Sequence, residues 1–402
     1  MLARSTRLMS STNELFSCPL TGGIGVRTQQ VSGPLASILS PPPVPSKLPL
    51  EERFKLCKAV ADFGGEITVE EELLALLRAK ASPICYDGFE PSGRMHLAQG
   101  VMKALNVNRL TEAGCVFVFW VADWFALMNN KMGGDLHKIQ RVGQYFVEVW
   151  KALGMNMENV RFLWASEEIN KDPSGYWIRV MNIARANTIA RINRCSQIMG
   201  REAGEDQKAA QILYPCMQAA DVFYLGVDIC QLGKDQRKVN MLAREFLDSA
   251  ECLDKRDKPI ILSHGMVPGL VEGQEKMSKS DPDSAIFMED SVEDVNRKIK
   301  KAFCPPGIIQ GNPCTQYVQM LVFPVYGKFE IIRSEKNGGN VLFQTTEAFN
   351  EAYLSGAIHP GDLKASLAAV INQMIEPVRK HFREDPFASQ LLAEIRSYKV
   401  TK

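Results

Sequence analysis

Short apolar runs alternate with helical stretches through the first part of this chain. Residues 84–86, 115–122 and 160–164 form three such runs, and a stretch of helical periodicity over residues 136–153 separates the second run from the third. Strands that are apolar along their whole length are typical of a parallel sheet with helices on both faces. The alternation therefore predicts a doubly wound, Rossmann-like α/β domain.

Further segments extend this pattern. Residues 51–64 and 69–80 have the pattern of two helices that lead into the first strand. Residues 178–199 predict a long helix with many arginines. Residues 222–225 and 260–262 are short apolar runs, which predict two more strands and a sheet of about five.

Length and composition agree with an enzyme of two domains. The chain has 402 residues, of which 46% are hydrophobic and 23% charged, and this is enough for one large core and a smaller one. The net charge is +1, so a nucleic-acid surface would have to be a local patch. No run approaches 18 apolar residues, which argues against a membrane span. The ten cysteines include no CxxC pair, so we expect reduced thiols and no metal site.

The chain divides into four predicted regions. The first, residues 1–48, contains Arg4, Arg7 and a single acid, Glu14, and ends in a proline-rich stretch typical of an extended linker. It is either an organelle transit peptide or an untargeted, disordered extension. The others are a helical lead-in at 49–80, the α/β domain at 81–295 with a helical connective insertion at about 168–211, and a helical domain at 296–402.

A glycine turn follows the first strand. Gly88 and Gly93 allow the backbone to approach a ligand closely, and a helix is expected to open near His96. The unpaired amides of a first helical turn favour an anion, and His96 can donate a hydrogen bond to a phosphate oxygen. The alternative is a histidine that only caps the turn.

A second phosphate signal lies about 180 residues further on. Residues 276–280, Lys-Met-Ser-Lys-Ser, combine two lysines and two hydroxyls with little bulk, which suits a mobile clamp for polyphosphate. Alone, the run is equally typical of a solvated Lys/Ser turn. Together with the turn at His96, it predicts a nucleotide site.

Three polar residues point to a second ligand. Tyr214, Gln218 and Asp221 are spaced i, i+4 and i+7, which places them on one helix face. A buried aspartate needs a partner, and a ligand hydroxyl would supply one. The alternative is a surface helix that exposes Gln218 and Asp221 to water. Residues 233–237 form another polar turn at a predicted strand end.

These motifs resemble a known family. His96 to Gln99 and residues 276–280 are similar to the HIGH and KMSKS motifs of class I aminoacyl-tRNA synthetases, although Ala98 and Gln99 replace the usual glycine and histidine. Lys279 is also a departure, because archaeal members usually carry serine there and plant-like relatives keep lysine. With residues 86–93, 214–221 and 235–238, the chain resembles tyrosyl-tRNA synthetases of the archaeal and eukaryotic cytoplasmic type from about residue 50 to its end.

The resemblance implies roles for individual residues. Tyr86 and Asp221 would bind the phenolic hydroxyl of L-tyrosine, and its α-amino group would be held by Tyr214, Gln218 and Gln236. ATP would enter with Mg²⁺ and be bound by Gly88, Gly93, His96, Gln99, Lys276, Met277, Ser278 and Lys279. Of these, His96, Lys276 and Lys279 would be catalytic.

The resemblance also implies partners. The enzyme would be a cytoplasmic homodimer that charges tRNA(Tyr), with mitochondrial or plastid import left open by the N-terminal extension. The basic residues Lys298, Lys300 and Lys301 would face tRNA, and His359 and Asp362 would lie near its anticodon. For the three lysines the alternative is a solvated helix face. For the second segment the alternative is a helix N-terminus at which Asp362 caps its own turn.

Three other functions remain open from the sequence. They are a tryptophan-specific sister synthetase, an adenylyltransferase that shares the phosphate motifs, and a catalytically silent RNA-binding relative. An indole offers no hydroxyl to Tyr86 and Asp221, an adenylyltransferase does not need the tyrosine pocket, and a silent relative would be expected to lose the lysines of the clamp.

Overall fold

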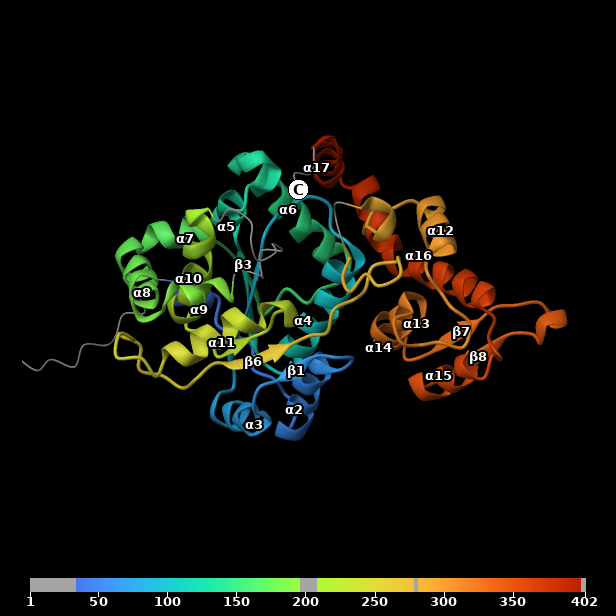
Figure 1. Ribbon diagram of the computed structural model, residues 1–402, viewed down its shortest axis with the longest axis horizontal. Helices are drawn as coiled ribbons and strands as arrows, with labels where there is room; N and C mark the ends of the chain where they lie inside the picture. The colour runs from blue at the N-terminus through green and yellow to red at the C-terminus, as the bar shows by residue number, and fades with distance from the viewer. Residues whose placement is uncertain (1–33, 196–207, 278–280, 399–402) are drawn as a thin grey trace, which may run out of the picture. The chain divides into compact units, whose positions relative to one another are not determined.

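A six-stranded sheet forms the centre of the molecule (Figure 1). The computed structural model describes residues 34–195, 208–277 and 281–398. In these residues the strand order is β1-β6-β5-β2-β3-β4, and only the edge strand β1 is antiparallel to its neighbour. The strands are β1 (Glu66–Ile67), β2 (Ile84–Phe89), β3 (Val116–Val121), β4 (Val160–Trp164), β5 (Ile229–Cys230) and β6 (Ile260–Ser263).

Successive residues of each strand enter two different cores. On β2 and β3, Cys85 and Phe117 belong to one buried cluster, whereas Tyr86 and Val118 belong to the other. All four are at most 1% exposed. Because both faces are buried, the strands contain almost no polar residues, as the sequence pattern predicted.

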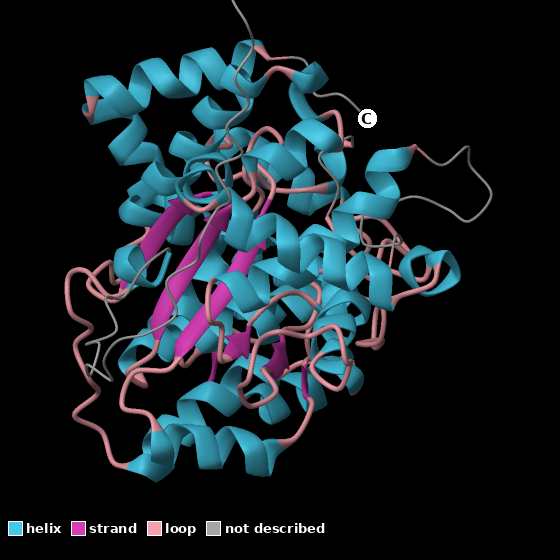
Figure 2. Ribbon diagram, turned by 90° about the vertical axis from the view of Figure 1, so that its left-hand side faces the viewer, coloured by secondary structure: helices cyan, strands magenta, loops and turns pink. Residues whose placement is uncertain are grey.

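Helices cover both faces of the sheet (Figure 2). One face is covered by α2 (Leu50–Lys58), α3 (Glu70–Ala79), α4 (Lys103–Glu112) and α6 (Leu136–Ala152). The other is covered by α5 (Asp123–Met128), α7 (Ala165–Lys171), α8 (Pro173–Ala186), α10 (Ala209–Tyr224) and α11 (Arg237–Phe246). The predicted doubly wound α/β fold is confirmed.

The strand order reverses between β2 and β5. From β2 the chain moves outward through β3 to β4, whereas β5 and β6 lie on its other side. In open parallel sheets, ligands bind in the crevice beyond the carboxyl ends of the strands at such a switch point. The segments that follow β2 and β5 therefore mark the place for a site.

Two predicted elements were wrong. Residues 222–225 are not a strand: they form the end of α10, and the strand is β5, a few residues later. This apolar run is buried in either conformation, so hydrophobicity alone cannot distinguish the two. The long helix predicted over 178–199 is also interrupted, because Thr188 starts a new helix, α9 (Ile189–Asn193), by accepting a 3.2 Å hydrogen bond from the Arg191 amide. Residues 196–199 lie outside the described part.

The last third of the predicted N-terminal extension, residues 34–48, is docked on the α/β domain. Its short helix α1 (Pro34–Ile38) ends at a fully buried isoleucine. Arg161 of β4 donates to the carbonyl of Ile38 at 3.1 Å and to that of Pro41 at 2.7 Å. Asn159 exchanges two hydrogen bonds with the backbone of Val44. A disordered extension up to residue 48 was therefore wrong for residues 34–48, and residues 1–33 are not described.

The C-terminal region is helical, as predicted, with one unexpected hairpin. Strands β7 (Phe329–Ile331) and β8 (Val341–Phe343) pair antiparallel, and their two phenylalanines pack on Phe349 with ring centroids 5.7 and 5.8 Å away. The predicted domain boundary at residue 295 lies inside the first helix of this region, α12 (Val292–Lys301). The helices are α12 (Val292–Lys301), α13 (Pro313–Tyr317), α14 (Phe323–Tyr326), α15 (Thr346–Leu354), α16 (Pro360–Glu384) and α17 (Pro386–Ser397).

Within the described ranges, the structure has no helix that is both long and apolar enough to cross a membrane. The nine cysteines of these ranges are free thiols, and all but Cys304 are buried.

Candidate active site

The two predicted phosphate elements are joined by backbone pairing. Two hydrogen bonds of 2.8 and 2.9 Å connect residues 95–97 with residues 286–288, and His96 forms a β-bridge with Phe287. The second segment follows the Lys-Met-Ser-Lys-Ser run by only a few residues. This pairing ties the chain just beyond the clamp to the histidine turn, although the two are far apart in the sequence.

The two glycines of the turn are needed for different structural reasons. Gly93 has a φ of 104°, which strongly favours glycine. At Gly88, an added Cβ would lie 2.9 Å from the hydroxyl oxygen of Tyr86. Gly88 therefore keeps open the space that the Tyr86 hydroxyl occupies, and Gly93 allows the turn itself.

The helix after the turn begins at Ala98, two residues later than expected. Its first turn is the π-helix η2 (Ala98–Met102), which continues into α4. Nδ1 of His96 accepts a long hydrogen bond, 3.4 Å, from the amide of Gln99, so the histidine also contacts the start of the helix. The side-chain Oε1 of Gln99 is buried and has no hydrogen-bond partner among the described residues. A buried acceptor of this kind is commonly paired with a ligand or with water.

Only the first part of the clamp is described. Lys276 is exposed, and its Nζ lies 3.5 Å from Oδ2 of Asp235, in the segment that follows β5. The side chain of Met277 is 6% exposed and belongs to the core, so it anchors the clamp. The predicted roles of Ser278 and Lys279 fall outside the described residues. The switch point thus brings Lys276 to the same end of the sheet as the glycine turn.

The predicted polar helix face exists on α10. Tyr214, Gln218 and Asp221 are 9%, 7% and 0% exposed, so the surface-helix alternative is wrong. Each contacts a different segment at the switch point. Tyr214 bonds to the end of β2, Gln218 bonds to Gln236 after β5, and Asp221 faces Tyr86 on β2.

Asp221 is a buried carboxylate held by tyrosine hydroxyls. Oδ1 accepts a 2.8 Å hydrogen bond from Tyr176 on α8, and Oδ2 lies 3.5 Å from the hydroxyl of Tyr86. Burial raises the pKa of Asp221 well above its ordinary value, and the two tyrosine hydroxyls oppose this rise by hydrogen bonding to the charged form. Sequence reasoning missed Tyr176, since nothing in the spacing along α8 relates it to a residue 45 positions away.

Glu90 was also missed, although it lies inside a motif that resembles the family. Its Oε1 accepts a 2.6 Å hydrogen bond from the hydroxyl of Tyr214. Asn129 donates to it at 3.2 Å, and the Nζ of Lys131 lies 3.9 Å away. The available signal was its position directly after β2, at the carboxyl end of a central strand.

Gln218 presents an acceptor in the same cluster of buried polar residues. Its Nε2 donates to Oε1 of Gln236 at 3.2 Å. Its own Oε1 is buried without a hydrogen-bond partner in the part of the chain that the structure describes. This cluster therefore contains an amide acceptor suited to an N–H donor such as an ammonium group.

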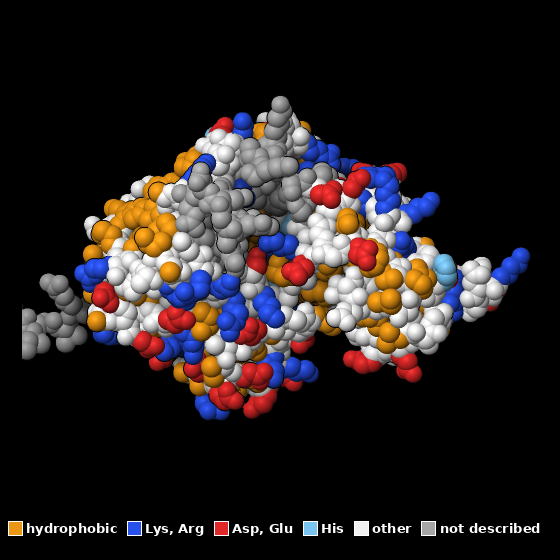
Figure 3. Space-filling model, viewed as in Figure 1, with side chains coloured by type: hydrophobic (Ala, Val, Ile, Leu, Met, Phe, Trp, Pro, Cys, Tyr) orange, Lys and Arg blue, Asp and Glu red, His pale blue; other side chains and the backbone are white. Residues whose placement is uncertain are grey.

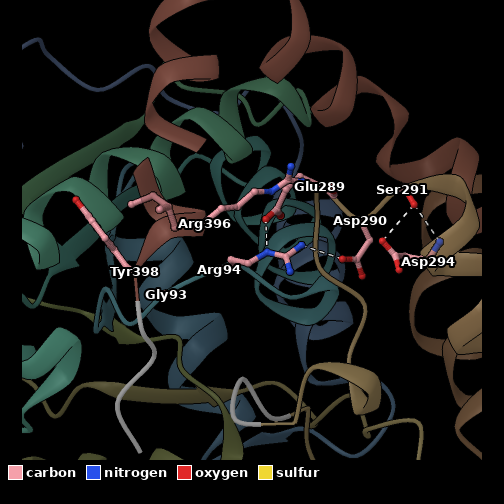
Figure 4. Close-up of a pocket in the computed structure, with 9 residues that line it drawn as sticks. Gly93, Arg94, Glu289, Asp290, Ser291, Asp294, Arg396 and Tyr398 are labelled. Atoms are coloured by element: carbon pink, nitrogen blue, oxygen red, sulfur yellow. Dashed lines mark hydrogen bonds and ion pairs between the residues drawn. The ribbon is translucent and has the colours of Figure 1, made fainter. Parts of the chain in front are cut away.

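A cavity of about 380 Å³ is lined in part by Gly93 and Arg94 of the glycine turn (Figure 4). Within it, Arg94 is placed between Glu289 and Asp290, with ion pairs of 2.5 and 2.8 Å. Arg396 of α17 donates to the carbonyl of Glu289 at 3.1 Å. These contacts hold the turn against the C-terminal region.

One predicted tRNA contact was wrong. Lys298 is 4% exposed, and its Nζ lies 2.6 Å from Oδ2 of Asp290 and 2.9 Å from the carbonyl oxygen of Ala285. It therefore supports the fold and is not available to a phosphate. The neighbouring Lys300 and Lys301 are exposed, as a tRNA role requires.

The other predicted contact region is the start of α16. His359 is exposed, and its Nδ1 caps the helix by accepting a 3.0 Å hydrogen bond from the amide of Gly361. Asp362 lies in the first helical turn. The capping residue is thus the histidine, whereas the alternative for this segment gave that role to Asp362.

Comparison with known proteins identifies the family. Residues 78–376 match the family model of class I tRNA synthetases (W and Y). The chain is 56% identical over 353 residues to tyrosine–tRNA ligase 1, cytoplasmic, of Arabidopsis thaliana, covering 88% of this chain and 90% of that protein.

Solved structures give the same relationship. Tyrosyl-tRNA synthetase of Leishmania major, in complex with tyrosinol, superposes with a TM-score of 0.81 at 49% identity; the match covers 88% of this chain and 53% of that one. The synthetase of Pyrococcus horikoshii, complexed with L-tyrosine, gives a TM-score of 0.79 at 33% identity, over 87% of this chain and all of that one. With its buried polar cluster at the switch point and both phosphate elements, this chain belongs to the tyrosyl-tRNA synthetases of class I.

Proposed function

We propose that this protein is a tyrosine–tRNA ligase. It activates L-tyrosine with ATP to tyrosyl-adenylate and pyrophosphate, and then transfers the tyrosyl group to the 3′ end of tRNA(Tyr). The observation that carries this function is the buried carboxylate of Asp221, which faces the hydroxyl of Tyr86. It forms an acceptor for a phenolic hydroxyl at the closed end of a pocket whose other end has acceptors for an amine.

Hydroxyl recognition follows from the geometry at Asp221. The 3.5 Å separation between its Oδ2 and the Tyr86 hydroxyl is long for an O–H···O hydrogen bond, so Oδ2 can accept a hydrogen bond from a substrate hydroxyl. Phenylalanine would leave this carboxylate without that donor. A site built to bind a hydroxyl rejects the analogue that lacks it by orders of magnitude, an effect for which this enzyme class is itself the standard example.

The α-amino group of tyrosine fits the other end of the pocket. Glu90 supplies a carboxylate, and Gln218 supplies a buried amide oxygen without a hydrogen-bond partner among the described residues. Tyr214 and Gln236 hold these two groups at 2.6 and 3.2 Å, respectively. An ammonium group therefore meets one charged and one neutral acceptor.

ATP is proposed to lie over the glycine turn, with its phosphates toward His96 and Lys276. The tyrosine carboxylate attacks the α-phosphorus, the bond to the β-phosphate oxygen breaks, and pyrophosphate leaves. In the second step, a terminal ribose hydroxyl of the tRNA attacks the carbonyl carbon and AMP leaves. Neither step needs a protein nucleophile, so positioning and charge stabilisation by His96, Lys276 and Lys279 supply the catalysis. Mg²⁺ arrives as part of the ATP substrate.

The tRNA is proposed to contact the C-terminal region, residues 296–402, while residues 81–295 carry the chemistry. Lys300 and Lys301 are exposed on α12, close in sequence to the clamp. His359 and Asp362, at the start of α16, are proposed to lie near the anticodon. Tight binding of RNA by a chain with a net charge of +1 requires such local basic groups.

A homodimer is proposed from the exposed apolar residues of the connective insertion. Ile178 and Met181 on α8 are 40% and 57% exposed, and Ile189 on α9 is 66% exposed. Figure 3 shows hydrophobic side chains gathered on the surface in this region. Apolar patches of this kind commonly mark subunit contacts. Sedimentation of the purified protein tests the dimer, and Met181→Glu should shift it toward the monomer.

The cytoplasm is the proposed location, because the Arabidopsis relative carries that description in its name. Import into mitochondria or plastids is the alternative that residues 1–48 leave open. Cell fractionation together with sequencing of the mature N-terminus separates the two, since cleavage before residue 34 would indicate import and would spare the docked helix α1.

The deciding experiment for the activity is exchange of labelled pyrophosphate into ATP. We expect exchange that depends on tyrosine and not on phenylalanine or tryptophan. Exchange with tryptophan alone would identify the sister synthetase, and exchange without any amino acid would indicate an adenylyltransferase. A folded protein that shows no exchange would be a silent RNA-binding relative, and the proposed function would be wrong.

A further inference from the structure

We infer that Tyr176 is a positioning residue for substrate specificity: its hydroxyl fixes the carboxylate of Asp221 so that Oδ2 faces the phenolic hydroxyl of the substrate. The inference rests on the proposed function of the tyrosine pocket. It assigns a role to a residue on α8, a helix of the connective insertion that otherwise has no part in the site. Tyr176 acts through Asp221 and does not itself contact the substrate.

The two oxygens of the Asp221 carboxylate face different tyrosines. Tyr176 donates to Oδ1 at 2.8 Å, a normal length for this type of bond, whereas Tyr86 lies 3.5 Å from Oδ2. The shorter bond is the one that determines the rotation of the carboxylate. With Oδ1 engaged, Oδ2 is the oxygen left for a ligand on the Tyr86 side.

Because both partners are buried, loss of this hydrogen bond should cost more free energy than loss of a surface hydrogen bond. Asp221 and Tyr176 are both 0% exposed, so water cannot replace a lost donor without entering the core. Burial also raises the pKa of Asp221, and the hydrogen bond from Tyr176 is the largest effect that lowers it. Tyr176 thus favours the ionised carboxylate, whose two oxygens can only accept hydrogen bonds, as a phenolic donor requires.

Tyr176 is itself held in place by its surroundings. Its ring meets the ring of Tyr224 edge-on, with centroids 5.2 Å apart and planes at 85°. Asp172 caps α8 one turn earlier by accepting a 2.9 Å hydrogen bond from Gly175. Helices α8 and α10 lie side by side (Figure 1), so the tyrosine reaches Asp221 across a packed helix pair. Such support is what an orienting residue needs to hold one geometry.

The test is Tyr176→Phe, measured by pyrophosphate exchange with tyrosine and with phenylalanine. A hydrogen bond to a charged group is typically worth a factor of about ten to a hundred. We expect KM for tyrosine to rise by about that factor, with kcat near the wild-type value. KM for phenylalanine should stay the same or fall, so that discrimination decreases through the hydroxyl contact alone.

Tyr224→Phe is the matched control. Tyr224 belongs to the same aromatic cluster, but its hydroxyl donates to the backbone carbonyl of Glu168 at 2.7 Å and not to Asp221. Its loss of thermal stability should be similar to that of Tyr176→Phe, and it should keep the full preference for tyrosine over phenylalanine. Loss of discrimination in both variants would mean that Tyr176 has only a packing role, and the inference would be wrong.

Failure of this inference can be distinguished from failure of the proposed function. If the wild-type protein does not exchange with tyrosine, the function itself fails. If it does, and Asp221→Ala loses discrimination while Tyr176→Phe keeps it, the pocket is correct and the role of Tyr176 is wrong. Should Tyr176→Phe not fold, Tyr176→His keeps a ring with an N–H donor and should give intermediate discrimination; full wild-type discrimination or none would overturn the inference.

Discussion

The hydroxyl of Tyr214 donates a 2.6 Å hydrogen bond to Oε1 of Glu90, which joins helix α10 to the end of strand β2. Burial raises the pKa of Tyr214 well above its ordinary value, so the hydroxyl remains a proton donor throughout the physiological range. The bond occupies one side of the Glu90 carboxylate and directs it. The proposed binding site for the substrate amino group is therefore built from two segments that are 124 residues apart.

Glu90→Gln should weaken tyrosine binding without changing selectivity. Loss of the negative charge opposite the ammonium group should raise KM for tyrosine by a factor of about ten to a hundred. The ratio of tyrosine to phenylalanine activity should remain, because Tyr86 and Asp221 are unchanged. Pyrophosphate exchange measures both, and Glu347→Gln on the exposed surface of α15 is the control. A changed ratio would show that Glu90 contacts the ring end of the substrate.

Lys276→Ala and Lys279→Ala should slow adenylate formation far more than they weaken tyrosine binding. Each lysine is proposed to contact the departing pyrophosphate, and loss of one such contact typically lowers the rate by about a hundred- to a thousandfold. Quenched-flow measurement of adenylate formation gives the rate, and equilibrium dialysis gives the affinity for tyrosine. Lys258→Ala, in a surface ion pair with Asp248, is the control. Equal losses of rate and affinity would place these lysines in ground-state binding.

Asp221→Asn should stabilise the protein increasingly as the pH rises. The pKa of Asp221 is raised in the folded state, whereas in the unfolded chain it is about 3.9. Between these values the unfolded chain releases the proton first, so the wild-type protein loses stability as the pH increases. Asparagine does not ionise, so the variant does not lose stability in this way as the pH increases. Thermal melts from about pH 4 to pH 8 should therefore show a difference in Tm in favour of the variant that grows up to the folded-state pKa of Asp221 and levels off above it, where the carboxylate is ionised in both states. A constant difference would mean that Asp221 is ionised with an ordinary pKa.

Mutations of the α12 lysines should have different effects, because Lys298 is buried whereas Lys300 and Lys301 are exposed. Lys298→Ala breaks an ion pair whose two side chains are 4% and 3% exposed, and it should cost about 3 kcal/mol or more of unfolding free energy. Lys300→Ala and Lys301→Ala should change stability by only about 0.5 kcal/mol or less. They should instead raise KM for tRNA and lower the salt dependence of tRNA binding. Denaturant melts and aminoacylation at two salt concentrations test this, and an unchanged KM for tRNA would remove both exposed lysines from the interface.

The sequence was most informative where the chemistry depends on local spacing. The face formed by Tyr214, Gln218 and Asp221 follows from the helical repeat alone, and α10 confirms it. Strands β2, β3 and β4 were also visible in the sequence, because burial on both faces leaves few polar residues in them. The strand predicted at 222–225 failed for the same reason. Complete burial removes the periodicity that distinguishes a helix from a strand.

Other features had no local signal. The docking of residues 34–48 depends on Arg161 and Asn159, which bond to backbone carbonyl and amide groups that every sequence contains. Lys298 reads as part of a basic helical face, yet the fold turns it inward to Asp290. In the first case the partners are distant in the sequence and are backbone groups that carry no residue identity. In the second case Asp290 lies only eight positions before Lys298 but outside the helix, so the helical repeat does not relate the two residues.

The sequence by itself determined the fold class, the family and the chemical groups of the site, because these depend on periodicity and on short motifs. Only the tertiary structure decided how those groups are paired. The contact of Tyr176 with Asp221, and that of Tyr214 with Glu90, arise from helices and strands that pack against one another across the sheet. The orientation of buried side chains is set by such packing, and it determines which oxygen of Asp221 remains for the proposed substrate hydroxyl.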